Sequence, residues 1–439
     1  MTPVIRFATI GFLFLLQALA QLTAQSNTQP SKNQDGELKF VVYLSRHGVR
    51  SPTGKPEQYN PYSLAPWPAW DVPPGYLTAH GFELMKLFGA YDRMEFASEG
   101  LLASDGCADA GRVTFYSDSD QRTIETGKAL AAGFFPGCAT SVRGLLEGTA
   151  DPLFHSNPTS RSEGDSSLET AAIAGRIGGD PNNLTAAFHP QLVELDRILA
   201  TCGASVSDPN HRISLFDIPA TLSGGQESHH AELKGPLNTA ATLTENLLLE
   251  YAQGMDAANV GWGCVDGANL RSLLALHTGA EDFTARTPAI ARIQAAKLLD
   301  QIHLSLKQAI AGKRIPGALS KPSDRALILV GHDTNLSNVA GLLNLDWIAD
   351  GRRDDTPPGG ALIFELWRSR ATGNYLIRTF FTSQTLEQMR SAASLSQENP
   401  PQRVPLFLPG CSAGDFSCSW SSFDETIHRA IDPHPKSSH

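Results

Sequence analysis

Residues 40–52 read FVVYLSRHGVRSP, and this stretch predicts both the fold class and the place of the functional site. Its first five residues, Phe40 to Leu44, are all apolar and mostly β-branched or aromatic, which is typical of a strand buried on both faces. The run ends at Ser45-Arg46-His47-Gly48. Charged side chains therefore follow directly on a buried strand, at the edge where open α/β sheets bind ligands.

Two later stretches repeat this layout of a strand followed by polar residues. Ala326 to Val330 (ALILV) is again a short apolar run, and it ends at Gly331-His332-Asp333 before a helical segment from about Asn335. Arg112 to Ser117 (RVTFYS) is a third candidate strand, followed by a helical run from Gln121 to Phe135. The two histidine motifs are distant in sequence, yet we expect them to share one edge of the sheet.

Long amphipathic helices alternate with these strands. Apolar residues recur at helical spacing over about 79–96, after a possible N-cap at Thr78, and again from Thr287-Pro288 to about 310. Two runs near the end, 361–367 and 375–381, predict a hairpin. This alternation predicts an α/β fold with a mostly parallel sheet flanked by helices.

The middle of the chain has a different character. Residues 147–287 contain few strand-like runs, several Gly-rich and Pro-rich loops and one clear helix, at 236–253. We expect an inserted, smaller α-helical domain there, so that residues 37–146 and 288–430 form the α/β domain.

Composition and the N-terminus restrict the class of protein further. The chain has 439 residues, of which 41% are apolar and 18% charged, which favours a globular protein. A formal net charge of −10 without a block of Lys and Arg argues against nucleic-acid binding. Residues 1–24 combine Arg6, an apolar run and small residues at Ala20 and Ala24, which predicts a cleaved secretory signal. An N-terminal membrane anchor is the alternative; after cleavage we expect no membrane contact.

Six cysteines in an exported chain favour disulfide bonds, and no C-x-x-C pair or zinc-like Cys/His spacing is present in the sequence. Proximity in the sequence suggests Cys411–Cys418. Cys107 and Cys138 flank a strand-and-helix segment and could join its two ends. Cys202–Cys264 follows only by elimination. Because six cysteines allow many pairings, this connectivity is a hypothesis.

The residues at the two strand ends are suited to phosphoryl transfer. The neutral ring of His47 can attack phosphorus and form a phosphohistidine, while Arg46 and Arg50 hold phosphate oxygens. His332 can hold another oxygen, and the carboxyl of Asp333 can protonate the leaving alkoxide. Each motif could also be purely structural, the first as a solvated loop and the second as a turn. Their expected position at one edge of the sheet favours a catalytic role.

Arg122 is a third element of the expected site. It falls in the first turn of a helix, where the helix dipole favours anions and a cation is out of place. Either Asp118 and Asp120 neutralise it, or the helix end and the guanidinium bind a phosphate together.

Together these motifs resemble the histidine acid phosphatases, and more closely their bacterial periplasmic phytase and glucose-1-phosphatase branch. The resemblance starts from R-H-G-x-R-x-P followed far downstream by H-D, and it covers nearly the whole mature chain. The other matching segments are Ser117 to Thr123 (SDSDQRT), Gly331 to Leu336 (GHDTNL), Thr356 to Gly360 (TPPGG) and the pair Cys411 and Cys418.

The resemblance implies a phosphomonoesterase with an α-helical insertion that faces the phosphate site. It implies that His47 is the nucleophile and Asp333 the proton donor, and that no metal or cofactor takes part. The implied phosphate clamp is Arg46, Arg50, Arg122 and His332.

The implied substrate is phytate, because Asp-Thr-Asn after the second histidine is similar to the phytase type. Thr53, Lys55 and Glu245 are possible substrate contacts, although Gly54 separates Thr53 from Lys55 and Glu245 has the alternative of a solvated helix residue. The other functions considered are a glucose-1-phosphatase, a broader sugar-phosphate phosphatase and a phosphate-ester binding protein without turnover. We expect a periplasmic or secreted monomer. We also expect an acidic pH optimum, because Asp333 must be protonated to donate and an ordinary carboxyl has a pKa of about 4.

Overall fold

A computed structural model describes residues 36–155, 163–203, 212–224 and 231–432. The predicted signal peptide, residues 1–24, lies outside these ranges. The chain divides into two compact units, residues 1–36 and 37–439, and the second unit contains the fold and the site. In the described residues no helix is both long and apolar enough to span a membrane.

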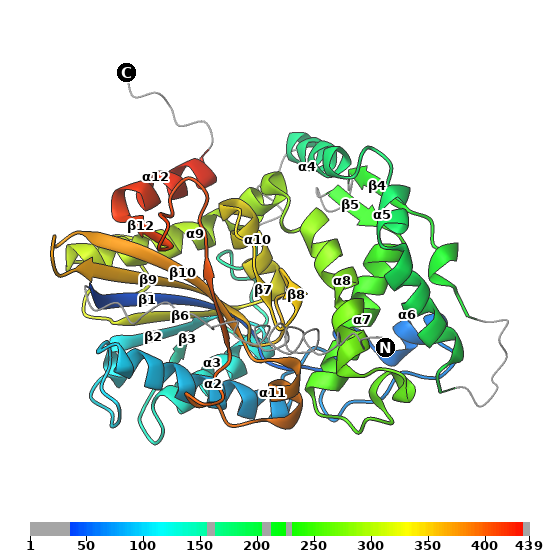
Figure 1. Ribbon diagram of the computed structural model, residues 1–439, viewed down its shortest axis with the longest axis horizontal. Coiled ribbons are helices and arrows are strands. Elements are labelled where there is room, and N and C mark those ends of the chain that lie inside the picture. The colour runs from blue at the N-terminus through cyan, green and yellow to red at the C-terminus, as the bar shows by residue number, and fades with distance from the viewer. Residues whose placement is uncertain (1–35, 156–162, 204–211, 225–230, 433–439) are drawn as a thin grey trace, which may run out of the picture. The chain divides into compact units, whose positions relative to one another are not determined.

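A mixed sheet forms the centre of this unit (Figure 1). Its strands follow the order β11-β10-β9-β1-β6-β2-β3, and β12 pairs with β10. Neighbours among β1, β6, β2 and β3 are parallel, whereas β10 pairs antiparallel with β9, β11 and β12. The strands are β1 (Gly36–Arg46), β2 (Val113–Ser117), β3 (Val142–Arg143), β6 (Ala326–Gly331), β9 (Ala361–Ser369), β10 (Tyr375–Ser383), β11 (Gln402–Leu406) and β12 (Ser417–Ser419). The expected α/β sheet is confirmed, as is the hairpin of β9 and β10.

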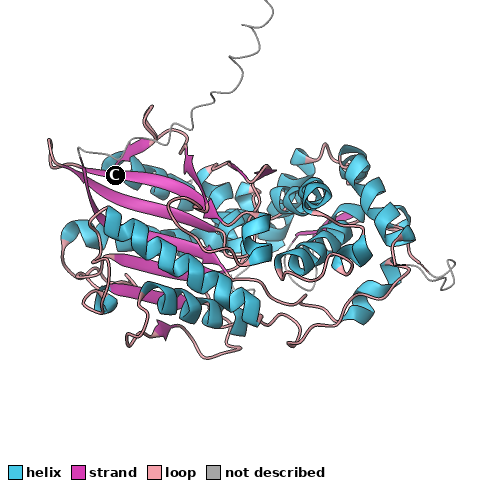
Figure 2. Cartoon of the chain, turned by 60° about the horizontal axis from the view of Figure 1, so that its bottom comes forward, coloured by secondary structure: helices cyan, strands magenta, loops and turns pink. Residues whose placement is uncertain are grey.

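Helices cover both faces of the sheet (Figure 2), and the alternation of β1 explains why. Phe40, Val42 and Leu44 belong to one apolar core with residues of α9, α10 and α12, whereas Val41 and Tyr43 belong to another core with α2 and α3. Full burial of each such side chain contributes about 1.5–3 kcal/mol. These helices are α2 (Ala79–Ser98), α3 (Gln121–Phe134), α9 (Pro288–Ala311), α10 (Asp333–Leu343) and α12 (Trp420–Ile431).

Helices α2 and α9 begin where the sequence placed them, and α10 begins at Asp333, two residues before the expected start near Asn335. Thr78 caps α2, because its side-chain oxygen accepts a hydrogen bond from the backbone N–H of Gly81. Pro288 is the first residue of α9, where a missing N–H is tolerated. Strand β1 is longer than expected and includes Arg46 itself.

The stretch between α3 and α9 is richer in helices than the sequence indicated. Only the helix at 236–253 was expected there, but this region holds α4 (Glu163–Arg176), α5 (Asn182–Ala187), α6 (His189–Thr201), α7 (Pro236–Ala252), α8 (Gly267–Phe283) and the hairpin β4 (Thr221–Gly224) with β5 (Ala231–Lys234). The start of α8 has a clear signal that was overlooked, since Asp266 accepts hydrogen bonds from the N–H groups of Ala268 and Asn269. That this region is a separate domain stays a prediction.

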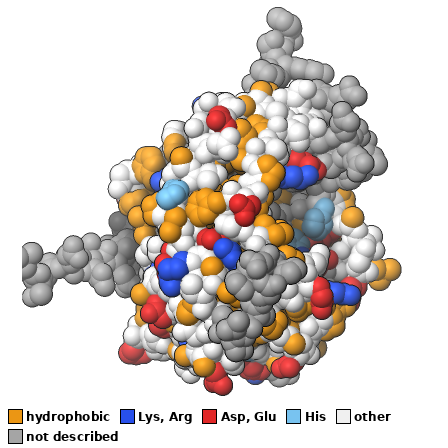
Figure 3. Space-filling view, turned by 90° about the vertical axis from the view of Figure 1, so that its right-hand side faces the viewer, with side chains coloured by type: hydrophobic (Ala, Val, Ile, Leu, Met, Phe, Trp, Pro, Cys, Tyr) orange, Lys and Arg blue, Asp and Glu red, His pale blue; other side chains and the backbone are white. Residues whose placement is uncertain are grey.

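Short elements complete the described fold: α1 (Pro56–Tyr59), α11 (Leu386–Ser391), β7 (Ile348–Ala349) and β8 (Arg352–Arg353). The three expected disulfides are confirmed, including the pair inferred by elimination: Cys107–Cys138, Cys202–Cys264 and Cys411–Cys418. On the face drawn in Figure 3, acidic, basic and hydrophobic side chains are interspersed among the described residues.

Candidate active site

The parallel register of the sheet brings the predicted motifs together. Arg46 pairs with Gly331 across β1 and β6, and the backbone N–H of His47 donates to the carbonyl of Gly331 at 2.9 Å. On the other side of β6, the N–H of Asp118 donates to the carbonyl of Val330 at 2.9 Å. Three polar segments therefore leave the sheet at one edge.

His47 is buried in this edge, with a free face on the cleft. Its Nδ1 lies 2.8 Å from the carbonyl oxygen of Gly48, which can only accept, so Nδ1 carries the proton and Nε2 keeps its lone pair. Burial lowers the pKa of His47 well below its ordinary value, and the charges of Arg46 and Arg50 lower it further. The ring is therefore neutral, which is the nucleophilic form.

Arginine side chains surround His47. Arg46 is fully buried and its Nη1 donates to the carbonyl of Thr356 at 2.7 Å. Its Nη2 contacts both Glu245 and Asp333, the latter at 3.0 Å, and Nη2 of Arg50 contacts Glu245 at 2.9 Å.

Each of the three site arginines also keeps a buried nitrogen without a hydrogen-bond partner among the described residues. These are the Nε atoms of Arg46, Arg50 and Arg122. Buried polar groups are normally paired, so three unpaired arginine donors near His47 support an anion site beside it.

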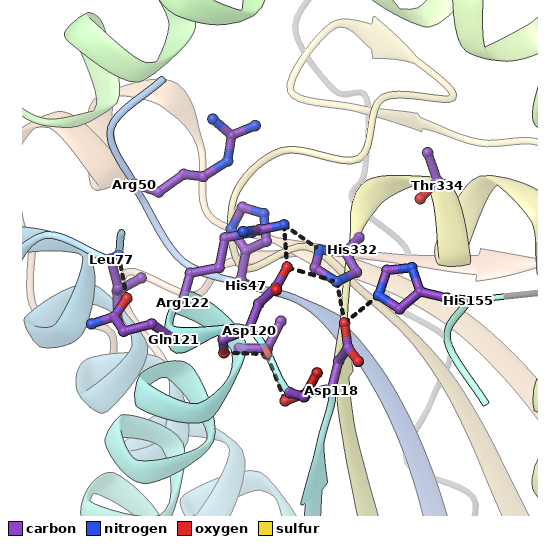
Figure 4. A network of polar contacts seen from close by, with 12 residues as sticks. His47, Arg50, Leu77, Asp118, Asp120, Gln121, Arg122, His155, His332 and Thr334 are labelled. Atoms are coloured by element: carbon purple, nitrogen blue, oxygen red, sulfur yellow. Dashed lines mark hydrogen bonds and ion pairs between the residues drawn. The ribbon is translucent and has the colours of Figure 1, made fainter. Parts of the chain in front are cut away.

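The second histidine lies beside the first. The ring centroids of His47 and His332 are 5.7 Å apart. Nε2 of His332 lies 2.6 Å from Oδ2 of Asp118, and Nε2 of His155 lies 2.7 Å from the same oxygen. Figure 4 shows this carboxylate between the two rings. One fully buried carboxylate thus orients two histidines.

The shared carboxylate shifts the pKa values of this cluster. Burial alone raises the pKa of Asp118, but the hydrogen bonds with His155 and His332 outweigh it and the pKa is lowered. The hydrogen bond with Asp118 raises the pKa of His155, against the effect of burial. Asp118 is therefore ionised, and acid pH favours a cationic His155 at the rim of the cleft.

Arg122 is paired with one of its two neighbouring acids. Oδ2 of Asp120 lies 2.6 Å from Nη2 of Arg122, whereas Asp118 is engaged with the histidines. The same Nη2 lies 3.3 Å from Nδ1 of His332. Asp120 therefore forms the direct ion pair with Arg122, and the charge of Asp118 acts on the guanidinium from further away. That Arg122 binds a phosphate stays a prediction.

Asp333 is the first residue of α10 and is largely buried. Burial raises its pKa, but Arg46 and then His277 and Arg50 lower it, and the pKa lies well below the ordinary value. In the cleft without substrate Asp333 is thus ionised. A bound anion that neutralises Arg46 would raise the pKa and favour the protonated form.

One cleft of about 480 Å³ is lined by His47, Arg50, Arg122, His155, His332 and Asp333, whereas Arg46 and Asp118 are fully buried and do not line it. Thr53 lies in it as expected, and so does Glu245, whose side chain is 13% exposed and is not the solvated helix residue that was the alternative. Lys55 is exposed and lines a neighbouring pocket with Trp67 and Trp70 rather than this cleft.

Three further residues of the cleft were not anticipated from the sequence. His155 lies beyond any motif, and His277 with Glu281 comes from α8, a helix that was not predicted. Their spacing of four residues places both on one face of a helix, which is the signal that could have found them. Nε2 of His277 and Oε2 of Glu281 are buried without a partner among the described residues.

Burial raises the pKa of Glu281 to about 7, and the negative charge of Asp333 adds to this effect. The helical side of the cleft therefore holds a carboxyl that is neutral at acid pH, opposite a group of fixed cations.

The fold and the site together define a class: an α/β enzyme that hydrolyses phosphate monoesters, with paired histidines and arginines at the carboxyl edge of its sheet. The chain matches the model of the histidine phosphatase superfamily (branch 2) over residues 37–202 and 206–382. It belongs to this family.

Known proteins are similar along nearly the whole chain. Phytase AppA of Escherichia coli is 36% identical, covering 97% of this chain and 98% of that protein. A glucose-1-phosphatase of Salmonella typhimurium is 29% identical, covering 94% of this chain and 96% of that protein. The solved structure of Hafnia alvei phytase with tartrate has a TM-score of 0.83 and 33% identity, covering 92% of this chain and 99% of that one. The expected family is confirmed.

Proposed function

We propose that this enzyme is an acid phosphatase of the phytase type that works through a phosphohistidine on His47. The observation that carries the proposal is the cleft in which a neutral His47 ring lies 5.7 Å from His332, among arginines with unpaired Nε atoms. A tetrahedral anion can contact both rings and the guanidinium groups at once.

The reaction proceeds in two displacements. In the first, the Nε2 lone pair of His47 bonds to phosphorus, the ester P–O bond breaks, and Asp333 gives its proton to the leaving oxygen. In the second, Asp333 takes a proton from water, the water oxygen bonds to phosphorus, and the P–N bond breaks to release phosphate and neutral His47. Arg46, Arg50 and Arg122 stabilise the negative charge of the phosphoryl oxygens throughout.

His332 is positioned beside His47 by two contacts. Its Nε2 lies 2.6 Å from Oδ2 of Asp118, and its Nδ1 lies 3.3 Å from Nη2 of Arg122. The carboxylate of Asp118 therefore orients the ring so that it can contact a phosphoryl oxygen of the bound ester.

Phytate is the proposed substrate, and two observations support it. The chain is 36% identical to the phytase of Escherichia coli. A substrate with several phosphates also offers anions to both Arg50 and the raised-pKa His155 at the two sides of His47. The alternative is glucose 1-phosphate, which the glucose-1-phosphatase relative supports.

We also propose that the enzyme is exported and acts as a monomer. Three disulfides fit an oxidising compartment, and the leader-like sequence of residues 1–24 fits a secretory signal. The boundary of the mature N-terminus, read by mass spectrometry of exported protein, and light scattering of the purified enzyme test the two parts.

The deciding experiment measures phosphate release from phytate, glucose 1-phosphate and p-nitrophenyl phosphate from about pH 3 to pH 9, with a chelator present. We expect the highest kcat/KM on phytate, on the acid side of neutrality. A higher kcat/KM on glucose 1-phosphate would select the alternative, and no release from any ester would reject phosphatase activity.

A further inference from the structure

A second cluster of metal-ligand side chains lies outside the cleft, between α9 and the last helix, α12. It consists of His303 on α9 and of Asp424 and His428 on α12. None of the three lines the active-site cleft as the described residues define it. Neither the phosphatase mechanism nor the family motifs use them.

The donor atoms of this cluster converge. Nε2 of His303 lies 2.6 Å from Oδ1 of Asp424, and Nε2 of His428 lies 3.7 Å from the same oxygen. All three donor atoms lie within 4.8 Å of one another. In a tetrahedral zinc site with bonds of about 2.0–2.2 Å, neighbouring donor atoms are about 3.3–3.6 Å apart. Small side-chain rotations therefore suffice to place all three atoms around one ion.

The surroundings hold part of the cluster in place and leave part of it open. The side chain of His303 is 2% exposed, and its ring stacks on Trp420 at 5.5 Å with an angle of 9°. Asp424 is 33% and His428 is 65% exposed, so an ion and its water can enter from solvent. Packing thus orients one ligand, and the four-residue spacing on α12 places the other two on one helix face.

We propose that His303, Asp424 and His428 bind one divalent transition-metal ion, of the zinc type, that ties α12 to α9. Two imidazoles and one carboxylate suit Zn²⁺, Ni²⁺ or Cu²⁺ rather than Mg²⁺ or Ca²⁺, which prefer oxygen ligands. Three protein ligands leave the fourth tetrahedral position to water. Asp424 supplies the negative charge, and Lys307, a cation that acts on His303, is exposed to solvent.

The site would act on stability rather than on turnover. α12 is the last described element, and it packs on the sheet through Phe423 and Ile427 in the same apolar core as α9. A metal bridge adds a link from His303 to this helix. Because the metal binds the folded state, it raises the melting temperature, by about 3 °C at a hundredfold excess over the dissociation constant for a chain of this length.

The test is a calorimetric titration of the full mature chain with ZnCl₂, beside hydrogen exchange of residues 420–431. We expect one ion bound at this site and slower amide exchange in α12. His428→Asn removes an exposed ligand without touching the core, and it should weaken this binding at least about tenfold and abolish the slower exchange. His189→Asn, at an exposed position of α6, is the matched control and should bind as the parent does.

Among the described residues, another cluster could also hold a metal ion: Asp118, His155 and His332 of the active site. A separate variant, His155→Asn, distinguishes zinc bound there from zinc bound at the proposed site. Zinc bound there would be lost in His155→Asn and kept in His428→Asn. Binding that is unchanged in His428→Asn, whether or not His155→Asn removes it, overturns the proposal. His434 and His439, outside the described residues, are present in every protein compared.

Discussion

The two walls of the cleft differ in origin and in their response to pH. The strand-end wall, residues 46–50, 118–122 and 332–334, leaves the carboxyl edge of the sheet and carries arginines and histidines. The helical wall, Glu245, His277 and Glu281, comes from α7 and α8. Contact with arginine decides the pKa of each carboxyl: Arg46 and Arg50 lower the pKa of Asp333 and of Glu245, whereas Glu281 has no such contact among the described residues, and burial and the charge of Asp333 raise its pKa.

The two walls therefore have different expected roles in catalysis. Burial and the fixed cations of the strand-end wall lower the pKa of His47, and we propose that these cations also hold the phosphate. The helical wall holds the carboxyl whose charge changes near neutrality. We therefore expect substitutions on the first wall to remove chemistry, and substitutions on the second wall to change how activity depends on pH.

The largest effect is expected for His47→Ala. Loss of the proposed nucleophile should reduce kcat on every phosphate ester by at least about a thousandfold, because the phosphoenzyme is proposed to form on His47. Rapid acid quench with labelled substrate should trap a phosphohistidine in the parent and none in the variant. His189→Ala, an exposed histidine on α6, should keep parental turnover. Trapping of label on the His47→Ala protein would contradict the assignment.

Asp333→Asn tests the proton donor on the same wall. An alkoxide of inositol is a strong base and needs a proton, whereas p-nitrophenolate leaves without one. Loss of general acid catalysis should therefore lower kcat on phytate by about 100- to 10,000-fold and on p-nitrophenyl phosphate by much less. Equal losses on both substrates would show that Asp333 has another role, such as holding Arg46, from which it lies 3.0 Å.

Glu281→Gln tests the helical wall, and a smaller effect is expected. Glu281 is neutral below its raised pKa of about 7 and gains a negative charge above it, next to Asp333 and Glu245. In the parent, KM for phytate should therefore rise as pH passes from about 6 to 8, because a polyanion meets a new anion. The glutamine variant should lack this rise, by a difference of about threefold to tenfold in KM near pH 8.

The less charged p-nitrophenyl phosphate supplies the internal control for Glu281→Gln. Its KM should differ much less between the two proteins, since it brings one phosphate that the arginines already neutralise. Identical phytate profiles for parent and variant would remove Glu281 from the pH response.

The contrast between the walls also explains how much the sequence could show. The strand-end wall was predictable because Arg46, His47, His332 and Asp333 lie at the ends of buried apolar strands, and the parallel register then brings these motifs together. His277 and Glu281 were missed because an apolar pattern marks the buried face of a helix but not which distant cleft its polar face lines. His155 depends on the same tertiary packing, since its contacts with Asp118 and with the ring of His332 connect it to the site.

The same reasoning applies to Lys55, which lies close to the first motif in sequence but lines a different pocket. Gly54, whose N–H donates to the hydroxyl of Tyr59 at 2.7 Å, directs the chain away before Lys55. Local sequence therefore predicted the reacting groups, and tertiary packing decided which neighbours join them.

The smallest effect is expected at Glu250, a carboxyl of α7 that is 2% exposed and lies outside the cleft. Burial raises its pKa to about 8 in the fold, against 4.5 as its ordinary value, while the N–H of Gly261 donates to its Oε2 at 2.9 Å. Between these pKa values the unfolded chain releases a proton that the folded chain keeps. Its contribution therefore favours folding below about pH 4.5 and declines as pH rises toward 8, by about 1 kcal/mol per pH unit.

Glu250→Gln removes this titration but keeps a side-chain oxygen that can accept the hydrogen bond from Gly261. The variant therefore shows whether ionisation of residue 250 raises or lowers the stability of the fold. The melting temperature of the variant minus that of the parent should increase from about pH 5 to pH 7, with each 1 kcal/mol equal to about 1–2 °C for a chain of this size. Glu83→Gln, on the exposed side of α2, should give a difference that is small and nearly constant. A difference that decreases with pH would mean that Glu250 is ionised in the fold. The pH response of the helical part would then be confined to Glu281 and the cleft.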